Sequence, residues 1–218
     1  MSLLILGSTG GTGKLLVREA IHNGYNVRTI ARQPEKLPLE NKNLTVFEGN
    51  PSDPRLLASA LEGCQTVISA LNISRKSLNP WSSLITPPEF MSQTMQRVIR
   101  IGSEKQLKRI VVISAWGVNE SFKELPFWFR AMVKWSNIGP AYRDHGRQEN
   151  ILRSSGLEWT AVRASGLTDS EAPKEVQVSI KGKPKPSLTI SRHNVARFII
   201  DEIRNREYLN KAVTISES

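Results

Sequence analysis

The sequence contains little cysteine, little histidine and no long apolar run. Its one cysteine, Cys64, excludes an internal disulfide framework and fits a reducing compartment, so we predict a cytoplasmic protein. Its three histidines are scattered with no metal-ligand spacing, so we expect no metal. No apolar run could span a bilayer, and the N-terminus enters a predicted strand without a basic segment or a cleavage site. We therefore expect neither a membrane partner nor a secretory signal.

Acidic residues are also scarce. The chain has 20 Asp and Glu against 30 Lys and Arg, a net charge of +10. Such a surface suits nucleic acids, anionic membranes or small acidic ligands. The basic residues are dispersed, apart from Lys181, Lys183 and Lys185 in a proline-containing loop. Dispersion favours a solvated face with a locally positive pocket for phosphates over a stripe that binds a duplex, so we disfavour nucleic acid as a partner.

One stretch near the N-terminus organises the rest of the chain. The apolar run Leu3–Leu6 predicts a buried strand, and Lys14–Asn23 has the apolar spacing of a helix. The turn between them is Gly7-Ser8-Thr9-Gly10-Gly11-Thr12-Gly13. Strand, glycine turn and helix, in this order, are the context of a dinucleotide-binding fingerprint. Glycines let the backbone approach a pyrophosphate, and free N–H groups at the helix start favour the anion.

Two alternatives to a dinucleotide site apply to this stretch. Gly13-Lys14 is similar to the end of a P-loop, but a P-loop needs glycine at Ser8 and Ser or Thr at Leu15. The P-loop is therefore excluded. A plain glycine-rich turn between a strand and a helix is the other alternative.

The end of the second predicted strand bears on the choice of cofactor. Arg32 follows the strand Tyr25–Ala31, ~20 residues beyond the glycine turn. An acidic residue there would bind the ribose hydroxyls of NAD, whereas an arginine accommodates the 2′-phosphate of NADP. No Asp or Glu occupies positions 26–34, so the sequence favours NADP, with an ordinary surface arginine as the alternative. Asn50, after the third strand Leu44–Phe47, is placed to hydrogen-bond adenine.

The whole chain alternates between predicted strands and helices. Further strands are expected at 66–70, 109–113, 158–163 and 212–215, and two more at 176–180 and 187–190 around a turn at 181–184. Helices are expected at 55–61, 88–103, 142–155 and 194–205. With short connections and no linker, this pattern predicts an α/β fold: a doubly wound, mostly parallel sheet with helices on both faces, as a single domain over residues 1–218.

Aromatic residues are concentrated between positions 121 and 138. Six apolar side chains predict a ridge there: Phe122, Phe127, Trp128, Phe129, Met132 and Trp135. Our first interpretation is a cover over the active cleft, because pockets for flat ligands are lined by such residues. A subunit interface and a plain core helix are the alternatives, so a monomer and a homodimer both stay open. We expect residues 121–140 and 166–190 to form the substrate side.

Several motifs together resemble a known family. They are the glycine fingerprint, Arg32, Ser114 after a Val-Val-Ile strand, the run 152–163, and Ser191-Arg192-His193-Asn194-Val195-Ala196. The chain resembles the atypical short-chain dehydrogenases of the NmrA-like and biliverdin reductase B (NADPH-flavin reductase) type, which have an NAD(P)-binding Rossmann fold. Members of this type reduce flavins, quinones or tetrapyrroles by hydride transfer, and some only sense the cofactor ratio.

The resemblance implies a position for NADP(H) along the chain. The cofactor would lie across Gly7, Thr9, Gly10, Thr12 and Gly13, and Arg32 would bind the 2′-phosphate. Asn50 would lie near adenine, and Ala70 and Leu71 near the ribose. Ser114 and the backbone around Ala164 and Ser165 would flank the nicotinamide.

The sequence departs from the alcohol dehydrogenases of this larger family, which use a tyrosine with a lysine four residues later. Here Gly146 follows Tyr142 at that offset, so alcohol chemistry is disfavoured. His145 and Glu149 share one helix face and form a possible polar pair, although a histidine on a helix surface is usually inert. Ser114, Tyr142 and His145 are the catalytic candidates.

Reduction of a flavin or quinone is compatible with this departure, because such acceptors take a hydride with protonation from solvent. We predict an NADPH-dependent reductase of FMN, FAD, a quinone or biliverdin. Basic residues near the cleft favour a phosphate-bearing acceptor such as FMN. The alternatives are a cofactor-binding sensor without turnover and a nucleotide-sugar epimerase or dehydratase, which would need the Tyr/Lys pair and a larger substrate domain.

Overall fold

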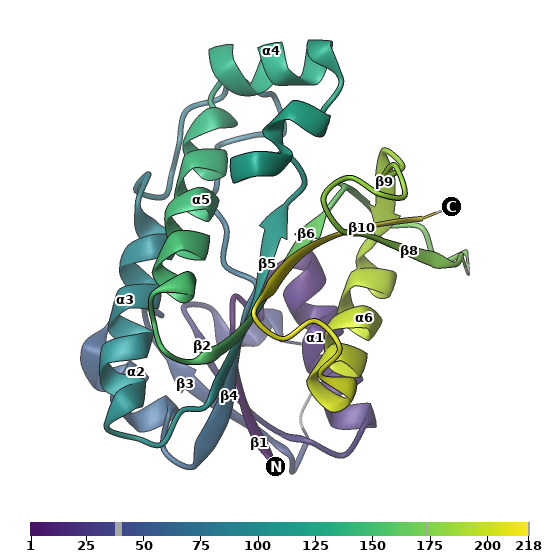
Figure 1. The fold of residues 1–218 in the computed structure, drawn as a ribbon. Helices are drawn as coiled ribbons and strands as arrows, with labels where there is room; N and C mark the ends of the chain where they lie inside the picture. Colours follow the sequence, from purple (N-terminus) through teal and green to yellow (C-terminus); the bar gives the residue numbers. More distant parts are fainter. Residues whose placement is uncertain (38–40, 173, 218) are drawn as a thin grey trace.

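A computed structural model describes residues 1–37, 41–172 and 174–217, and its main feature is one eight-stranded sheet between two layers of helices (Figure 1). The strands are β1 (Ser2–Leu6), β2 (Asn26–Ala31), β3 (Leu44–Glu48), β4 (Cys64–Ser69), β5 (Arg109–Ala115), β6 (Glu158–Ala164), β7 (Gly166–Thr168), β8 (Val176–Ser179), β9 (Thr189–Ser191) and β10 (Lys211–Glu217). The helices are α1 (Gly11–His22), α2 (Pro54–Ala60), α3 (Phe90–Ser103), α4 (Phe127–Trp135), α5 (Gly139–Arg153) and α6 (Arg192–Asn205), with 3-10 turns η1 (Pro34–Lys36) and η2 (Asn119–Glu124).

The sheet is doubly wound, as the alternation of strands and helices predicts. Its strand order is β3-β2-β1-β4-β5-β6-β10-β8, and only β8 runs antiparallel to its neighbour. The chain moves outward from β1 to β3 on one side and from β4 to β10 on the other. The order therefore reverses between β1 and β4, and ligands of such sheets bind in the crevice at that reversal, at the carboxyl ends of the strands.

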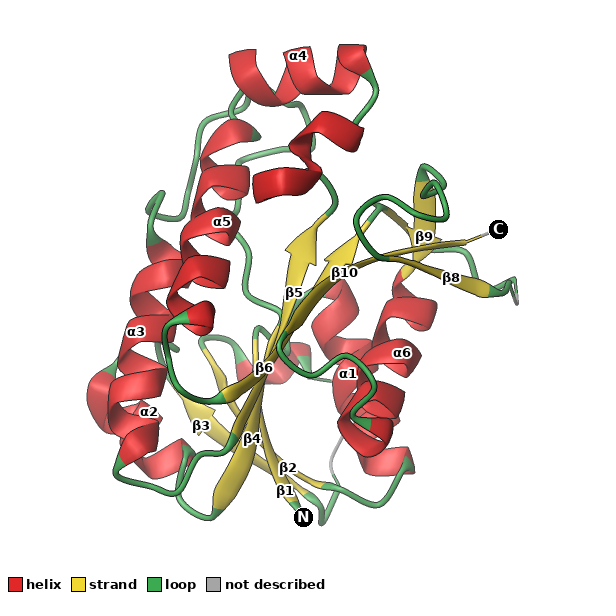
Figure 2. Cartoon of the chain, in the orientation of Figure 1, coloured by secondary structure: helices red, strands yellow, loops and turns green. Residues whose placement is uncertain are grey.

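Both faces of the sheet are buried. Within β1, Leu3 and Ile5 belong to a core beneath α1 and α6, whereas Leu4 and Leu6 belong to a second core beneath α2, α3 and α5. Figure 2 shows these two groups of helices on opposite sides of the sheet. A continuous apolar run is what a strand needs when helices cover both of its faces. The predicted single-domain fold class is thereby confirmed.

The two strands predicted at 176–180 and 187–190 correspond to β8 and β9, which do not pair with each other. β8 pairs with β10, and β9 pairs with β7, a short strand that periodicity did not reveal. Each strand finds its own apolar contacts, because Val178 packs against the core beneath α6 and Ile190 is fully buried in that core. Long-range burial therefore overrides the local turn signal.

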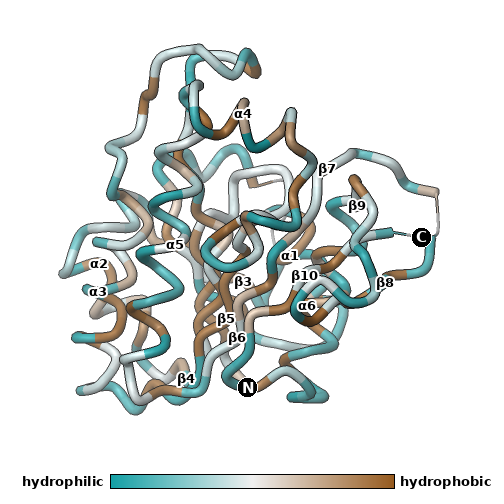
Figure 3. The backbone as a smooth tube through the Cα atoms, turned by 45° about the horizontal axis from the view of Figure 1, so that its top comes forward, coloured by the Kyte–Doolittle hydropathy of each residue, from teal (hydrophilic) through white to brown (hydrophobic). Residues whose placement is uncertain are grey.

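The predicted aromatic ridge is divided between a small core and the surface. Trp116, Leu125 and Val133 form a cluster against which Phe122 and Phe129 pack. In contrast, Phe127, Trp128 and Trp135 are exposed. The apolar segments drawn in brown in Figure 3 gather along β5 and β6 and recur on α4. Among the described residues, no helix combines the length and the apolar character needed to cross a bilayer.

Candidate functional site

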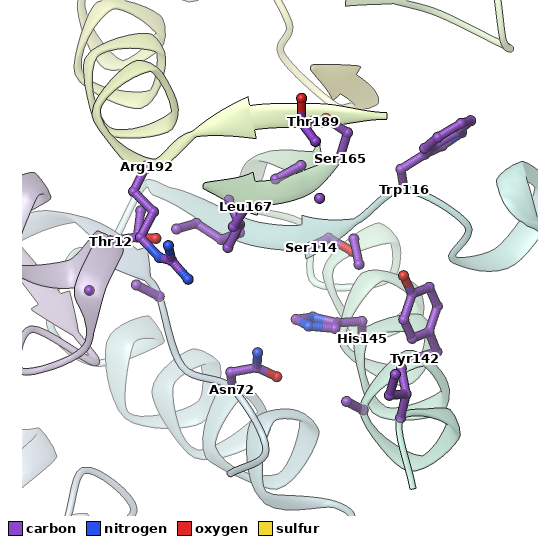
Figure 4. A pocket seen from close by; sticks show the side chains of 18 of the residues that line it. Thr12, Asn72, Ser114, Trp116, Tyr142, His145, Ser165, Leu167, Thr189 and Arg192 are labelled. Atoms are coloured by element: carbon purple, nitrogen blue, oxygen red, sulfur yellow. The ribbon is translucent and has the colours of Figure 1, made fainter. Parts of the chain in front are cut away.

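A cavity of about 730 Å³ opens at the carboxyl ends of the central strands, where the strand order reverses (Figure 4). The glycine turn and the start of α1 form one end of it. The ends of β4, β5 and β6 form its floor, and α4, α5 and the β7–β9 pair form the other walls. Its volume lies within the usual range for small-molecule and cofactor sites.

The glycine turn is shaped by contacts that exclude side chains. A Cβ atom on Gly7, which has φ +83°, would lie 2.6 Å from the Ala70 carbonyl oxygen. A Cβ atom on Gly13 would lie 2.0 Å from the Gly7 carbonyl oxygen. Only glycine fits at either position, and the packing sets the start of α1 directly at the cavity.

The start of α1 has no side-chain cap. Its N-cap is Gly10, whereas Asp53 caps α2 and Ser191 caps α6 with side-chain oxygens. The first N–H groups of a helix have no partner within the helix, and together with the helix dipole they attract anions. This bare cradle, formed by Gly10 to Gly13 along the cavity wall, fits a pyrophosphate.

The structure brings most of the predicted cofactor residues to this cavity. Those that line it are Gly10, Gly11, Thr12, Gly13, Ala70, Leu71, Ser114, Ala164 and Ser165. Gly7 and Thr9 belong to the turn beneath the cradle and are not part of the wall. The Ser8 side chain is buried, and its hydroxyl is hydrogen-bonded to the Thr29 hydroxyl at 2.7 Å. Its hydroxyl is therefore used inside the fold, away from the cavity.

Arg32 and Asn50 lie apart from the cavity but close to each other in the sheet. They follow the neighbouring parallel strands β2 and β3, whose last residues, Ala31 and Glu48, are paired. Both side chains are exposed. Asn50 accepts a hydrogen bond from the Ser52 backbone with its side-chain oxygen. Their assignment to the adenosine end of a cofactor stays a prediction.

A buried carboxylate controls the direction of the Ser114 hydroxyl. Ser114 donates to Glu149 Oε1 at 2.7 Å, and Glu149 is fully buried. Arg163 donates to both Glu149 oxygens, at 2.9 and 2.6 Å, and Asn119 donates at 3.0 Å. Because a hydroxyl has one proton and that proton is directed at Glu149, Ser114 presents only its acceptor lone pairs to the cavity.

Tyr142 and His145 point into the same part of the cavity as Ser114 (Figure 4). Burial raises the pKa of the Tyr142 phenol, which therefore keeps its proton at neutral pH. Gly146 stands four residues later, and a Cβ atom there would lie 2.9 Å from Asn119 Oδ1, the end of a side chain, and 3.7 Å or more from the other neighbours. The Tyr/Lys pair is therefore absent from the sequence, as predicted.

His145 is buried, so the general expectation for a histidine on a helix surface does not apply to it. The side chain is 5% exposed, and its Nδ1 atom has no hydrogen-bond partner among the described residues. Burial lowers the pKa of His145, and the carboxylates of Glu149 and Asp144 oppose that shift only in part. The ring is therefore neutral at pH 7. Its sequence position on an amphipathic helix did not reveal which helix face is buried.

Two arginines in the cavity wall were missed as site residues. Arg192 lies over the start of α1, with Cδ and Nε 3.0 Å from the position of a Cβ atom on Gly11. Its Nη1 donates to Asp169 at 2.7 Å. It belongs to a motif that supported the family resemblance, but the motif gave it no role. Arg75 comes from the Ser/Pro-rich segment after β4, where no local signal marks a site.

Comparison with known proteins assigns the family. The family model described as NAD(P)H-binding matches residues 7–206. The chain belongs to the NAD(P)H-binding family. The predicted class of cofactor, NAD(P)H, and the resemblance to NAD(P)-binding Rossmann proteins are confirmed at this level. The cradle at the start of α1 lies within the matched residues.

Two proteins with similar sequences align with nearly the full length of this chain. Reductase pytE of Aspergillus terreus is 22% identical, over 99% of this chain and 97% of its own. The uncharacterized sugar epimerase YhfK of Bacillus subtilis is 24% identical, over 100% of this chain and 94% of its own. The relatives' names therefore include both an oxidoreductase and an epimerase.

Two solved structures share the fold. The anaerobillin reductase ChuY of Escherichia coli O157:H7 is 19% identical with a TM-score of 0.79, over 100% of this chain and 97% of that chain. A short-chain dehydrogenase/reductase of Veillonella parvula in complex with NADP is 18% identical with a TM-score of 0.81, over 99% of this chain and 94% of that chain. At these identities the likeness shows the fold alone.

The cradle can be tested with two glycine variants. Gly10→Ala should fold normally, because its Cβ atom would lie 3.4 Å from its nearest neighbour, and it should raise the Kd for NADPH about tenfold or more by placing a methyl group where the phosphates bind. Gly13→Ala should instead lower the melting temperature, because its Cβ atom collides with backbone. Calorimetric titration and thermal unfolding measure the two effects. Unchanged affinity in Gly10→Ala would place the pyrophosphate elsewhere.

The buried neutral His145 should make stability depend on pH. Unfolded histidine takes up a proton near pH ~6.5 but buried His145 does not, so the free energy of unfolding should fall as the pH drops below ~6.5. His145→Asn should weaken that dependence, whereas His22→Asn at an exposed position should leave it intact. Urea denaturation at a series of pH values measures the slopes. Equal slopes in wild type and His145→Asn would contradict the burial argument.

Proposed function

We propose that the protein is an NADPH-dependent reductase that transfers a hydride to a flat aromatic acceptor, such as a flavin, a quinone or a tetrapyrrole. The observation that carries this proposal is the make-up of the cavity. A bare anion cradle lies at one end, and an aromatic wall of Trp116, Trp128, Phe129 and Tyr142 lies at the other. Aromatic walls bind flat rings by stacking and exclude water from the site.

The cavity wall supplies partners for each part of the cofactor. Gly10 to Gly13 and Arg192 would bind the phosphates, and Ala70 and Leu71 would lie against the ribose. Ser165 Oγ is buried without a partner among the described residues, and it would hydrogen-bond a nicotinamide beside it. When bound, NADPH supplies a hydride from the nicotinamide ring.

The remaining polar side chains orient the ligands without exchanging protons. Ser114 accepts a hydrogen bond from an amide or ring N–H, because Glu149 fixes its own proton. Tyr142 donates to an acceptor carbonyl and holds its proton. His145 is neutral, so one of its ring nitrogens can donate a hydrogen bond and the other can accept one. The proton that completes the reduction comes from solvent, as quinone and flavin acceptors allow.

The names of similar proteins support this proposal. Reductase pytE aligns over 99% of the chain, and the anaerobillin reductase ChuY shares the fold from end to end. The alternative of an epimerase has the name of YhfK in its favour but lacks the Tyr/Lys pair. The missing lysine is also compatible with a cofactor sensor without turnover, because a sensor needs the anion cradle but no catalytic Tyr/Lys pair. We also propose a cytoplasmic location, on the single cysteine.

Steady-state assays test the reductase directly. The protein should oxidise NADPH in the presence of at least one of FMN, FAD, biliverdin and menadione (a neutral naphthoquinone), followed at the NADPH absorbance. Ser114→Ala should lower kcat/KM with the best of them about tenfold, because one oriented hydrogen bond is lost. Ser121→Ala removes another buried hydroxyl, in the turn at Val118–Ser121, and it should leave kcat/KM close to that of wild type. NADPH binding with no turnover of any acceptor would support the sensor.

The choice of NADP over NAD can be tested at Arg32. Arg32→Ala should weaken NADPH binding by roughly 10- to 100-fold and leave NADH binding unchanged, because a charged hydrogen bond to the 2′-phosphate contributes ~1.5–3 kcal/mol. Arg18→Ala removes the same charge from an exposed position on α1 and should change neither Kd. Competition titrations with both nucleotides measure the ratio. Parallel loss of both affinities would contradict a 2′-phosphate contact.

A further inference from the structure

We propose that the acceptor is an anion, and that Arg75 binds its carboxylate, phosphate or sulfonate group in the cavity. This inference rests on the proposed reductase function and narrows its substrate class to aromatic rings with an attached oxyanion. Four observations carry it: the unpaired guanidinium of Arg75, the charge of the two segments around it, the absence of carboxylates from the cavity wall, and the separate position of Arg192.

Arg75 lines the cavity and is half-buried. Its Nε atom is inaccessible to solvent and has no hydrogen-bond partner, and no acidic side chain pairs with the guanidinium within the described ranges. A buried donor without a partner costs free energy, and a guanidinium matches the two oxygens of an oxyanion. An anionic ligand in the cavity would therefore supply the hydrogen-bond acceptor that Arg75 lacks.

The segment that carries Arg75 is held in place. Arg75 forms a backbone bridge with Leu84, and Ser74 accepts from the Ile85 backbone at 2.8 Å while its own N–H donates to Thr86 Oγ1 at 3.1 Å. Asn137, next to α5, donates to the carbonyls of Trp81 and Ser82 at 2.9 and 3.2 Å. These bonds hold residues 74–86 against the chain between α4 and α5, so the backbone that carries Arg75 is fixed at the cavity wall.

The two segments that face each other here carry only positive charge. Residues 72–88 and 125–143 contain no Asp or Glu. Their five basic residues are Arg75, Lys76, Arg130, Lys134 and Arg143. Three acidic residues flank the segments directly: Glu89 is exposed, Glu124 accepts a hydrogen bond from Trp116 Nε1 at 3.1 Å, and Asp144 is buried and accepts hydrogen bonds from the first turn of α3. The excess of positive charge on the segments that carry Arg75, Trp128, Phe129 and Tyr142 to the cavity attracts anionic ligands and speeds their entry.

The cavity wall repeats this asymmetry. Among the described residues that line it, none is acidic, whereas Arg75 and Arg192 are cationic. Arg192 is accounted for, because it lies on Gly11 at the phosphate cradle and pairs with Asp169. Arg75 belongs to a different wall, formed by the chain after β4, next to Asn72 in the sequence. One arginine thus serves the cofactor and the other remains for the acceptor.

FMN and riboflavin provide the sharpest test, since they share one ring system and differ by a single phosphate. Kd values are measured from flavin fluorescence quenching with the protein saturated by NADP, which keeps Arg192 and the cradle occupied. Wild type should bind FMN about tenfold or more tightly than riboflavin, because the charged hydrogen bond between Arg75 and the phosphate of FMN adds to the affinity. Arg75→Gln should bring that ratio to about one without changing the Kd for riboflavin, which also reports that the variant is folded.

Lys76→Gln is the matched control, because it removes one charge from the adjacent exposed position and should keep the ratio within about twofold. Arg75→Lys should restore part of the preference. Equal affinity of wild type for both flavins, or a preference that survives Arg75→Gln, would overturn the inference. Binding of neither flavin would overturn it as well. Menadione is neutral, so its turnover tests the reductase proposal without involving Arg75. Failure of the reductase proposal can therefore be distinguished from failure of the proposal that Arg75 binds an anionic acceptor.

Discussion

The close approach of the glycine turn to the chain after β4 is the contact on which the rest of the site depends. Gly7 packs its backbone against the Ala70 carbonyl, and Gly13 packs against Gly7, with no room for a side chain at either position. Ala70 in turn donates its N–H to Leu6 at 2.8 Å. This contact lies between β1 and β4, where the strand order reverses, and it places the uncapped start of α1 at the cavity wall. The anion cradle and the floor of the cavity are therefore one construction.

A second constraint holds the opposite end of the cavity. Glu149 on α5 receives hydrogen bonds from Ser114 on β5, Arg163 on β6 and Asn119 on η2. A buried carboxylate is tolerable only with such partners, and loss of one of them would leave a charge uncompensated. The network therefore fixes α5 against the sheet, and Tyr142 and His145 on the same helix take their positions from it. Its most direct chemical consequence is that Ser114 can only accept.

Local patterns in the sequence predicted the parts of the fold that are themselves local. The apolar run at Leu3–Leu6 and the glycine turn after it each act within a few residues, and the structure has the strand and the turn as expected. The pairing of β9 with β7 was missed, because it depends on the burial of Ile190 beneath α6. His145 was misjudged for the same kind of reason. Helical spacing reveals that a face is apolar, but not which polar residue at its border becomes buried.

The two sides of the cavity differ in how they are encoded, and this difference explains which site residues were found. The cofactor side is a continuous turn of seven residues, so a fingerprint identifies it. The substrate side joins the segment 74–86 to α4 and α5 through the bonds of Asn137, across more than fifty positions in the sequence. Neither segment has a motif of its own, and their shared charge becomes meaningful only when they meet. The glycine at 146 is local in the same sense as the fingerprint, because the absence of a lysine four residues after Tyr142 can be seen in the sequence without knowledge of the fold.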